Sequence, residues 1–219
     1  PWHGLVRALG GDHGVPALDV LEGQGDLGAL DHSADETVEY VVHVMSHWLD
    51  RGAAGWRLDA AYAVPSPFWA RVLPQVKAAH PYSWIFGEVI HGDYPRIIEE
   101  STMDSITQYE LWKSIQHALE TENFFELDWN LKRHNAFLDS FVPQTFIGNH
   151  DVTRIASQIG PAKAALALAV LMTVGGVPSI YYGDAQGYGG VAQEGFGGDD
   201  DVRPKVPGSR AALSTRGEP

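Results

Sequence analysis

Gly55-Trp56-Arg57-Leu58-Asp59 is the segment from which the fold can be predicted. Side chains alternate along a β-strand, so Arg57 and Asp59 share one face while Trp56 and Leu58 point to the other. The pattern predicts a short strand whose apolar face meets helices and whose C-terminal end carries an acid. Four further strands are predicted, at 83–89, 104–108, 144–148 and 177–182.

Helical patterns separate these strands. The clearest follows Ser33-Ala34-Asp35-Glu36, which has the spacing of a capping box, and we expect this helix to stop at Gly52. A second helix is predicted to start at Ser66-Pro67. The remaining expected helices are at 95–100, 110–121, 124–141 and 162–174.

Strands that alternate with helices imply parallel β-α units. An open doubly wound sheet and a (β/α)8 barrel are both built in this way, and the alternation alone does not choose between them. Residues 1–30 show no clear periodicity and are expected to form a loop region. Seven glycines between Gly183 and Gly198 and the acidic run Asp199–Asp201 predict a Gly-rich loop and a mobile tail over 184–219.

Composition sets the broad class of the protein. The chain has 219 residues, 44% of them hydrophobic and 20% charged, as expected of one soluble globular unit. Its net charge of −13 argues against nucleic acid as a partner, and nothing in the charge pattern indicates binding to anionic membranes. Cysteine is absent, which excludes disulfides, thiolate catalysis and zinc sites built on cysteine.

The start of the chain shows no targeting segment. Pro1-Trp2-His3-Gly4 lacks a basic start and an apolar run, and because the first residue is not Met we expect the true N-terminus to lie upstream. The compartment stays unknown, with a cytoplasmic location favoured. The uncharged stretch from Ala164 to Tyr182 is predicted to be a buried helix and strand rather than a membrane span, because Gly175, Gly176 and Pro178 interrupt it.

Three carboxylates follow three different predicted strands: Asp59, Glu88 and Asp151. Active sites of parallel α/β folds form at that end of the sheet. Glu88 lies between Gly87 and the apolar pair Val89-Ile90, surroundings that favour a protonated acid. Less specific interpretations remain open, namely a structural Arg57–Asp59 ion pair, a solvated Glu88 and an ordinary Asn149-His150-Asp151 turn.

These residues carry a family resemblance. Gly55-Trp-Arg-Leu-Asp-Ala60, Gly87-Glu88-Val89 and Phe146-Ile-Gly-Asn-His-Asp151 resemble, in order and spacing, three signature regions of the α-amylase family of glycoside hydrolases, family 13. Gly176-Val-Pro-Ser-Ile-Tyr-Tyr-Gly-Asp184 resembles the eighth barrel strand of that family. The resemblance covers about residues 20–205.

The resemblance implies a (β/α)8 barrel and a retaining double displacement. It implies Asp59 as the nucleophile, Glu88 as the general acid/base and Asp151 as the carboxylate that stabilises the transition state. Arg57 would orient Asp59, while Asn149, His150 and the aromatic ring of Tyr62 would contact the sugar.

The five predicted strands match the fourth to eighth strands of such a barrel. A complete barrel takes about 250 residues, and the first signature region has no counterpart here. We therefore expect a partial barrel over 31–183 that lacks the first three strands. No cofactor or metal is expected, and calcium, which some relatives bind, is expected to matter little because Tyr62-Ala63 replaces the Lys-His of many starch-acting members.

The leading hypothesis is a retaining α-glycosidase that hydrolyses α-glucosidic bonds of oligo- or polysaccharides, with the chain as given an inactive fragment of it. Its expected partner is a carbohydrate, not nucleic acid or a membrane. Two alternatives stay open. One is a transglycosylase or isomerase on the same site, such as a trehalose synthase-like enzyme, and the other is a non-catalytic remnant that binds sugar.

Overall fold

The computed structural model describes residues 8–9, 17–18, 29–195, 197–206 and 208. The chain divides into two compact units, 1–106 and 107–219, and each is described by itself. Most of the expected N-terminal loop, and residues 209–219 of the expected tail, lie outside the described residues.

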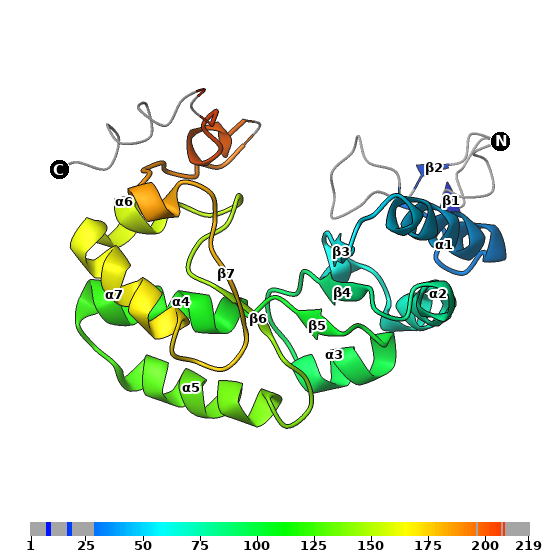
Figure 1. Ribbon diagram of the computed structural model, residues 1–219, viewed down its shortest axis with the longest axis horizontal. Coiled ribbons are helices and arrows are strands. Elements are labelled where there is room, and N and C mark those ends of the chain that lie inside the picture. Colours follow the sequence, from blue (N-terminus) through cyan, green and yellow to red (C-terminus); the bar gives the residue numbers. More distant parts are fainter. Residues whose placement is uncertain (1–7, 10–16, 19–28, 196, 207, 209–219) are drawn as a thin grey trace. The chain divides into compact units, whose positions relative to one another are not determined.

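The first unit is a parallel sheet covered by helices (Figure 1). Its elements are, in chain order, β1 (Ala8–Leu9), β2 (Ala17–Leu18), α1 (Asp35–Asp50), β3 (Gly55–Leu58), the 3-10 turn η2 (Ala61–Ala63), α2 (Ser66–Ala79), β4 (Trp84–Gly87), α3 (Tyr94–Ser101) and β5 (Ser105–Ile106). The sheet order is β3-β4-β5, with Arg57 opposite Phe86 and Gly87 opposite Ile106. β1 and β2 form a separate antiparallel pair.

Helix α1 begins without the predicted capping box. Its N-cap is Ala34, which makes no side-chain cap bond. The Ser33 hydroxyl donates instead to Asp31 Oδ1 at 2.6 Å, so the Ser33 side chain bonds to the preceding residues and does not accept from the first N–H groups of the helix. The predicted stop is confirmed, because Gly52 follows the helix with φ of +99°.

The core of the first unit lies between the sheet and α2. Val72, Val76 and Ile85 are fully buried, and α2 continues through Pro74. The Trp56 indole donates to the Met45 carbonyl of α1 at 3.2 Å. Trp56 therefore points to the helices, as the alternation in this strand predicts, which leaves Arg57 on the opposite face.

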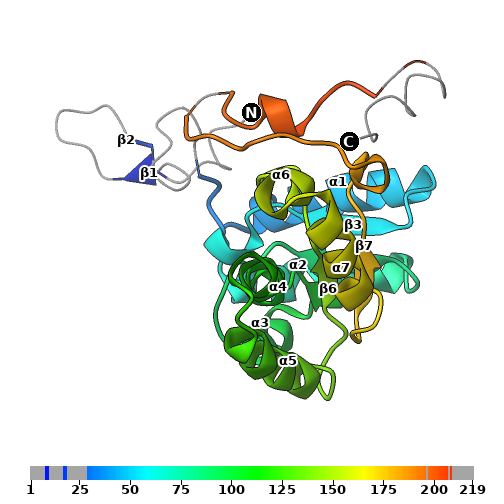
Figure 2. The same ribbon diagram turned by 90° about the vertical axis from the view of Figure 1, so that its left-hand side faces the viewer.

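The second unit also pairs parallel strands. Its elements are α4 (Tyr109–Thr121), α5 (Phe125–Phe137), β6 (Gln144–Phe146), α6 (Ile155–Ile159), α7 (Pro161–Leu171), β7 (Val177–Ser179) and the 3-10 turns η3 (Asp184–Gln186) and η4 (Asp200–Val202). β6 pairs with β7, and Thr107 forms a parallel bridge to Gln144. α4 and α7 lie side by side (Figure 2), with Leu111, Ile115 and Leu171 in their shared core.

His134 is a buried polar group in this unit. Its Nε2 lies 2.6 Å from the Gly175 carbonyl and its Nδ1 lies 3.4 Å from Gln108 Nε2. The carbonyl accepts only, so Nε2 carries the proton and Nδ1 accepts from the amide. Burial lowers the pKa of His134, against the opposing effect of the Gly175 bond. The neutral ring thus ties α5 to the turn before β7.

The predicted α/β fold with parallel strands is confirmed. The uncharged stretch from Ala164 to Tyr182 divides into the end of α7 and the short β7, as expected. The predicted burial of the strand is wrong, because β7 pairs only with β6 among the described residues and is exposed along its length. Across the described residues, every helix is too short or too polar to cross a membrane.

Candidate functional site

Arg57 joins two of the predicted acids in the first unit. Its Nη1 pairs with Asp59 Oδ1, and its Nη2 lies 3.1 Å from Glu88 Oε1. The Asp59 side chain is 79% exposed, whereas that of Glu88 is 10% exposed. One guanidinium therefore holds one solvent-facing and one buried carboxylate.

The backbone fixes Glu88 beside the end of β3. Its N–H donates to the Leu58 carbonyl at 2.8 Å, and its carbonyl accepts from the Tyr62 N–H at 3.1 Å. Its Oε2 accepts from the Ala60 N–H at 2.9 Å. The apolar surroundings expected from the sequence are only partly present, because Val89 is buried but the carboxylate itself meets a guanidinium and a backbone donor.

Close packing explains the glycine before Glu88. A Cβ on Gly87 would lie 2.5 Å from Met103 Sδ and 2.9 Å from the Ala61 Cβ, so a larger residue would displace this corner of the sheet. Tyr62 lies in η2 with its side chain partly exposed. The structure therefore brings Arg57, Asp59, Glu88 and Tyr62 together.

The second unit carries the other predicted residues on the turn after β6. The Asp151 N–H donates to Asn149 Oδ1 at 2.9 Å, and Asn149 Nδ2 donates to the Tyr109 hydroxyl at 2.7 Å. His150 Nε2 lies 3.2 Å from Asp151 Oδ2. Asn149, His150 and Asp151 thus form one local group, so the seven predicted residues fall into two groups, one in each unit.

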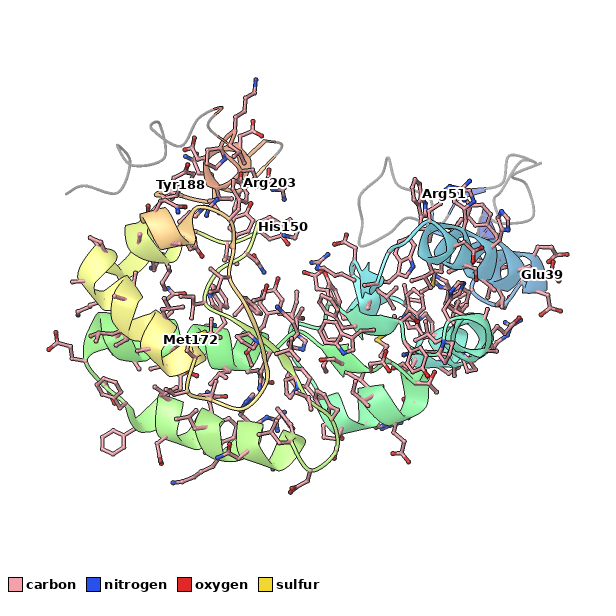
Figure 3. All side chains as sticks on the ribbon, in the orientation of Figure 1. Glu39, Arg51, His150, Met172, Tyr188 and Arg203 are labelled. Carbon is pink, nitrogen blue, oxygen red and sulfur yellow. The ribbon has the colours of Figure 1, made fainter. Side chains whose placement is uncertain are left out.

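Arg203 is a neighbour of this turn that the sequence did not reveal. Its Nη2 lies 2.9 Å from Asp151 Oδ1, and its Nε donates to the His150 carbonyl at 2.9 Å. Figure 3 shows Arg203 and His150 next to each other. Arg203 lies in the segment expected to be loop and tail, and its partners on this turn are more than 50 residues away in sequence, so the sequence did not indicate the contact.

A second arginine, Arg154, is buried close by. It is 1% exposed, and its Nη1 lies 2.9 Å from Asp184 Oδ1. Its guanidinium carbon lies 4.1 Å from the centre of the Tyr181 ring. Burial raises the pKa of Asp184, and the charge and hydrogen bond of Arg154 oppose that rise. Asp184 Oδ2 finds no hydrogen-bond partner among the described residues.

Within the part of the chain that the structure describes, no cluster of three or more His, Asp or Glu side chains could hold a metal ion. The chemistry available from the two groups is that of carboxylates, a guanidinium and an imidazole.

The sequence of the chain matches a known protein family. The family model described as alpha amylase, catalytic domain, matches residues 22–210. Neopullulanase 2 of Thermoactinomyces vulgaris is 32% identical over 162 residues, covering 71% of this chain and 28% of that protein. A cyclomaltodextrin glucanotransferase of Bacillus licheniformis is 31% identical over 192 residues, covering 83% of this chain and 26% of that protein.

A solved structure shares the fold. The cyclic α-maltosyl-(1→6)-maltose hydrolase of Arthrobacter globiformis superposes with a TM-score of 0.80 at 22% identity, over 98% of this chain and 50% of that protein. Structures of the same hydrolase contain its cyclic substrate or maltose. The chain therefore spans about half of this solved structure and less than a third of the two curated relatives.

Proposed function

Because the chain belongs to the α-amylase family of glycoside hydrolases, we propose that it is the later part of a catalytic barrel that cleaves α-glucosidic bonds with retention. β3 to β7 then correspond to the fourth to eighth barrel strands. The substrate class is α-linked gluco-oligosaccharides or polysaccharides. Support for that class comes from the family and from the maltose-containing structures of the fold relative.

The observation that carries the proposal is the bridge by Arg57. Retaining glycosidases need two carboxyl groups about 5–5.5 Å apart, and a single guanidinium that contacts both Asp59 and Glu88 keeps them close. Asp59 is the exposed member and can reach the anomeric carbon. Glu88 is the buried member and is positioned by three backbone contacts.

Asp59 and Glu88 have different roles in the two steps of the reaction. In the first, Asp59 attacks the anomeric carbon and Glu88 gives its proton to the departing oxygen, which breaks the glycosidic bond. In the second, Glu88 takes a proton from water, and that water displaces Asp59 from the sugar. The Arg57 and Ala60 contacts suit the carboxylate form of Glu88 that the second step requires.

Asp151 is proposed as the third acid, which favours the positive charge of the oxocarbenium-like transition state. His150 and Asn149 are proposed to contact sugar hydroxyls, and Tyr62 to stack on a sugar ring. Support for these roles comes from the family resemblance and from the ordered turn that holds the three consecutive residues.

Transfer is the second candidate function. The match to a cyclomaltodextrin glucanotransferase favours it, because the same glycosyl-enzyme can pass its sugar to another hydroxyl instead of to water. Product analysis after incubation of the complete parent protein with maltose would separate the two. Free glucose alone indicates hydrolysis, whereas longer or isomeric products indicate transfer.

Trapping of the covalent intermediate tests the proposal. The complete parent protein is incubated with a fluorinated α-glucosyl donor, digested and analysed by mass spectrometry. We expect the label on Asp59, and no label in Asp59→Ala. A label on another residue would overturn the assignment of the nucleophile.

A further inference from the structure

Arg203 contacts Asp151 and the backbone that carries it. One of its nitrogens, Nη2, binds Asp151 Oδ1, and another, Nε, binds the His150 carbonyl. The same Nη2 also pairs with Oδ2 of Asp199, four residues earlier. A planar guanidinium has donors in a fixed fork, so these simultaneous contacts define the direction of the carboxylate and of the turn together.

Arg154 fixes the residue next to Arg203. Its Nε and Nη2 both donate to the Val202 carbonyl, at 3.1 and 2.8 Å, while Nη1 donates to the Tyr182 carbonyl. Val202 is fully buried. The backbone immediately before Arg203 is thus held by a buried, charged donor and does not depend on the exposed ion pairs of Arg203 itself.

We propose that Arg203 is a positioning residue for Asp151, and that Arg154 sets the place of Arg203 by holding the Val202 carbonyl. The inference rests on the proposed role of Asp151. Asp151 lies on the turn after β6, and its side chain is 37% exposed. An acid in such a place would otherwise sample several rotamers, whereas a catalytic group has to stay within about 0.5 Å of its working position.

The charge arrangement strengthens the argument. Arg203 stands between two carboxylates, those of Asp151 and Asp199. Removal of the guanidinium leaves both acids without this shared counter-charge, and their repulsion then favours movement of Asp151 away from Asp199. Lysine would restore the charge but not the fork, because its single ammonium cannot reproduce the paired geometry on carboxylate and carbonyl.

Hydrogen exchange measured by mass spectrometry on the full 219-residue chain, without sugar, tests this inference. In Arg203→Met we expect exchange in the peptide containing 149–153 to rise about tenfold, since the turn opens locally more often. Arg203→Lys should recover part of the protection. Lys205→Met, which removes an exposed charge two residues away, is the matched control and should leave that peptide unchanged.

A double-variant comparison separates positioning from general loosening. If Arg203 acts through Asp151, then Arg203→Met adds little further exchange in an Asp151→Asn background. Arg154→Met should raise exchange in both 149–153 and 199–205. Equal exchange in Arg203→Met and the unsubstituted chain, or fully additive effects with Asp151→Asn, would overturn the inference. The readout needs no substrate, so it stands apart from the trapping test of the proposed function.

Discussion

The Ala60 N–H donates to Glu88 Oε2 at 2.9 Å from a backbone in the left-handed region, with φ of 44° and ψ of 35°. That conformation costs an L-residue about 1–2 kcal/mol. Strained backbone of this kind persists where the surrounding structure determines it, and it gathers at functional sites. The donor that meets the proposed acid/base is therefore aimed by a conformation that alanine adopts only at a cost.

Ala60→Gly should stabilise the chain. Glycine adopts φ of 44° without the Cβ clash, so we expect the free energy of unfolding to rise by about 0.5–1 kcal/mol despite the greater entropy of the unfolded chain. Urea denaturation followed by circular dichroism measures the change. Ala61→Gly is the matched control and should destabilise, because Ala61 is buried and its φ is not positive. A loss of stability in Ala60→Gly would contradict the strain argument.

Glu88→Gln in the complete parent protein should slow the cleavage of substrates with poor leaving groups far more than that of substrates with good ones. An unactivated glucosidic oxygen needs a proton from Glu88 as the bond breaks, whereas a nitrophenolate leaves without it. We expect kcat/KM for maltooligosaccharides to fall about 10²–10⁴-fold and the first step with activated aryl α-glucosides to fall much less. Equal losses of rate on both kinds of substrate would show that Glu88 is not the general acid.

The buried His134 should make the fold sensitive to acid. Burial lowers its folded-state pKa below the ordinary 6.5, so the unfolded chain takes up a proton that the folded chain does not. The contribution of His134 to the free energy of unfolding is fully present above about pH 6.5. It falls as the pH drops, by at most about 1.4 kcal/mol per pH unit.

His134→Gln tests the sign of this effect. Glutamine does not titrate, so the variant should lose less stability between pH 7.5 and pH 5 than the unsubstituted chain, when urea midpoints are compared. His43→Gln is the control, because His43 is exposed. If His134→Gln and the unsubstituted chain show the same pH dependence, the buried imidazole is not the source.

The helical period and the strand alternation of apolar residues were sufficient to predict the helices and strands that have strong local patterns. The alternation predicts that Arg57 and Asp59 lie on one face, and in the structure the two side chains form an ion pair, although β3 ends at Leu58. Helix α6 was missed because its five residues, Ile155–Ile159, are too few to show a helical period. The predicted strand 104–108 is shorter in the structure, where only Ser105–Ile106 pair with β4.

The contacts around Arg154 could not be predicted for a different reason. Its partners Tyr182, Asp184 and Val202 lie 28 to 48 residues further along the chain, and three of its four hydrogen bonds to them go to backbone carbonyls. Hydrophobic patterning assigns charged residues to the surface, yet this one is almost fully buried. The burial of such a charged residue can be predicted only when its tertiary partners are known.

We expect the 219-residue chain by itself to have no measurable glycosidase activity. Its described parallel strands are β3, β4 and β5 in one sheet and β6 and β7 in another, whereas a (β/α)8 barrel closes with eight. Strand β7 pairs only with β6 among the described residues and is exposed along its length, and an open edge of this kind invites association. The proposed acids would also lack the pocket wall that the remaining strands supply, so water would weaken the fixed electrostatics on which catalysis depends.

The measurement is release of aryl groups from aryl α-glucosides, and of glucose from maltooligosaccharides, by the purified chain, compared with its Asp59→Ala variant. We expect the two to be indistinguishable. Turnover by a monodisperse monomer that disappears in Asp59→Ala would show that these strands alone build a working site.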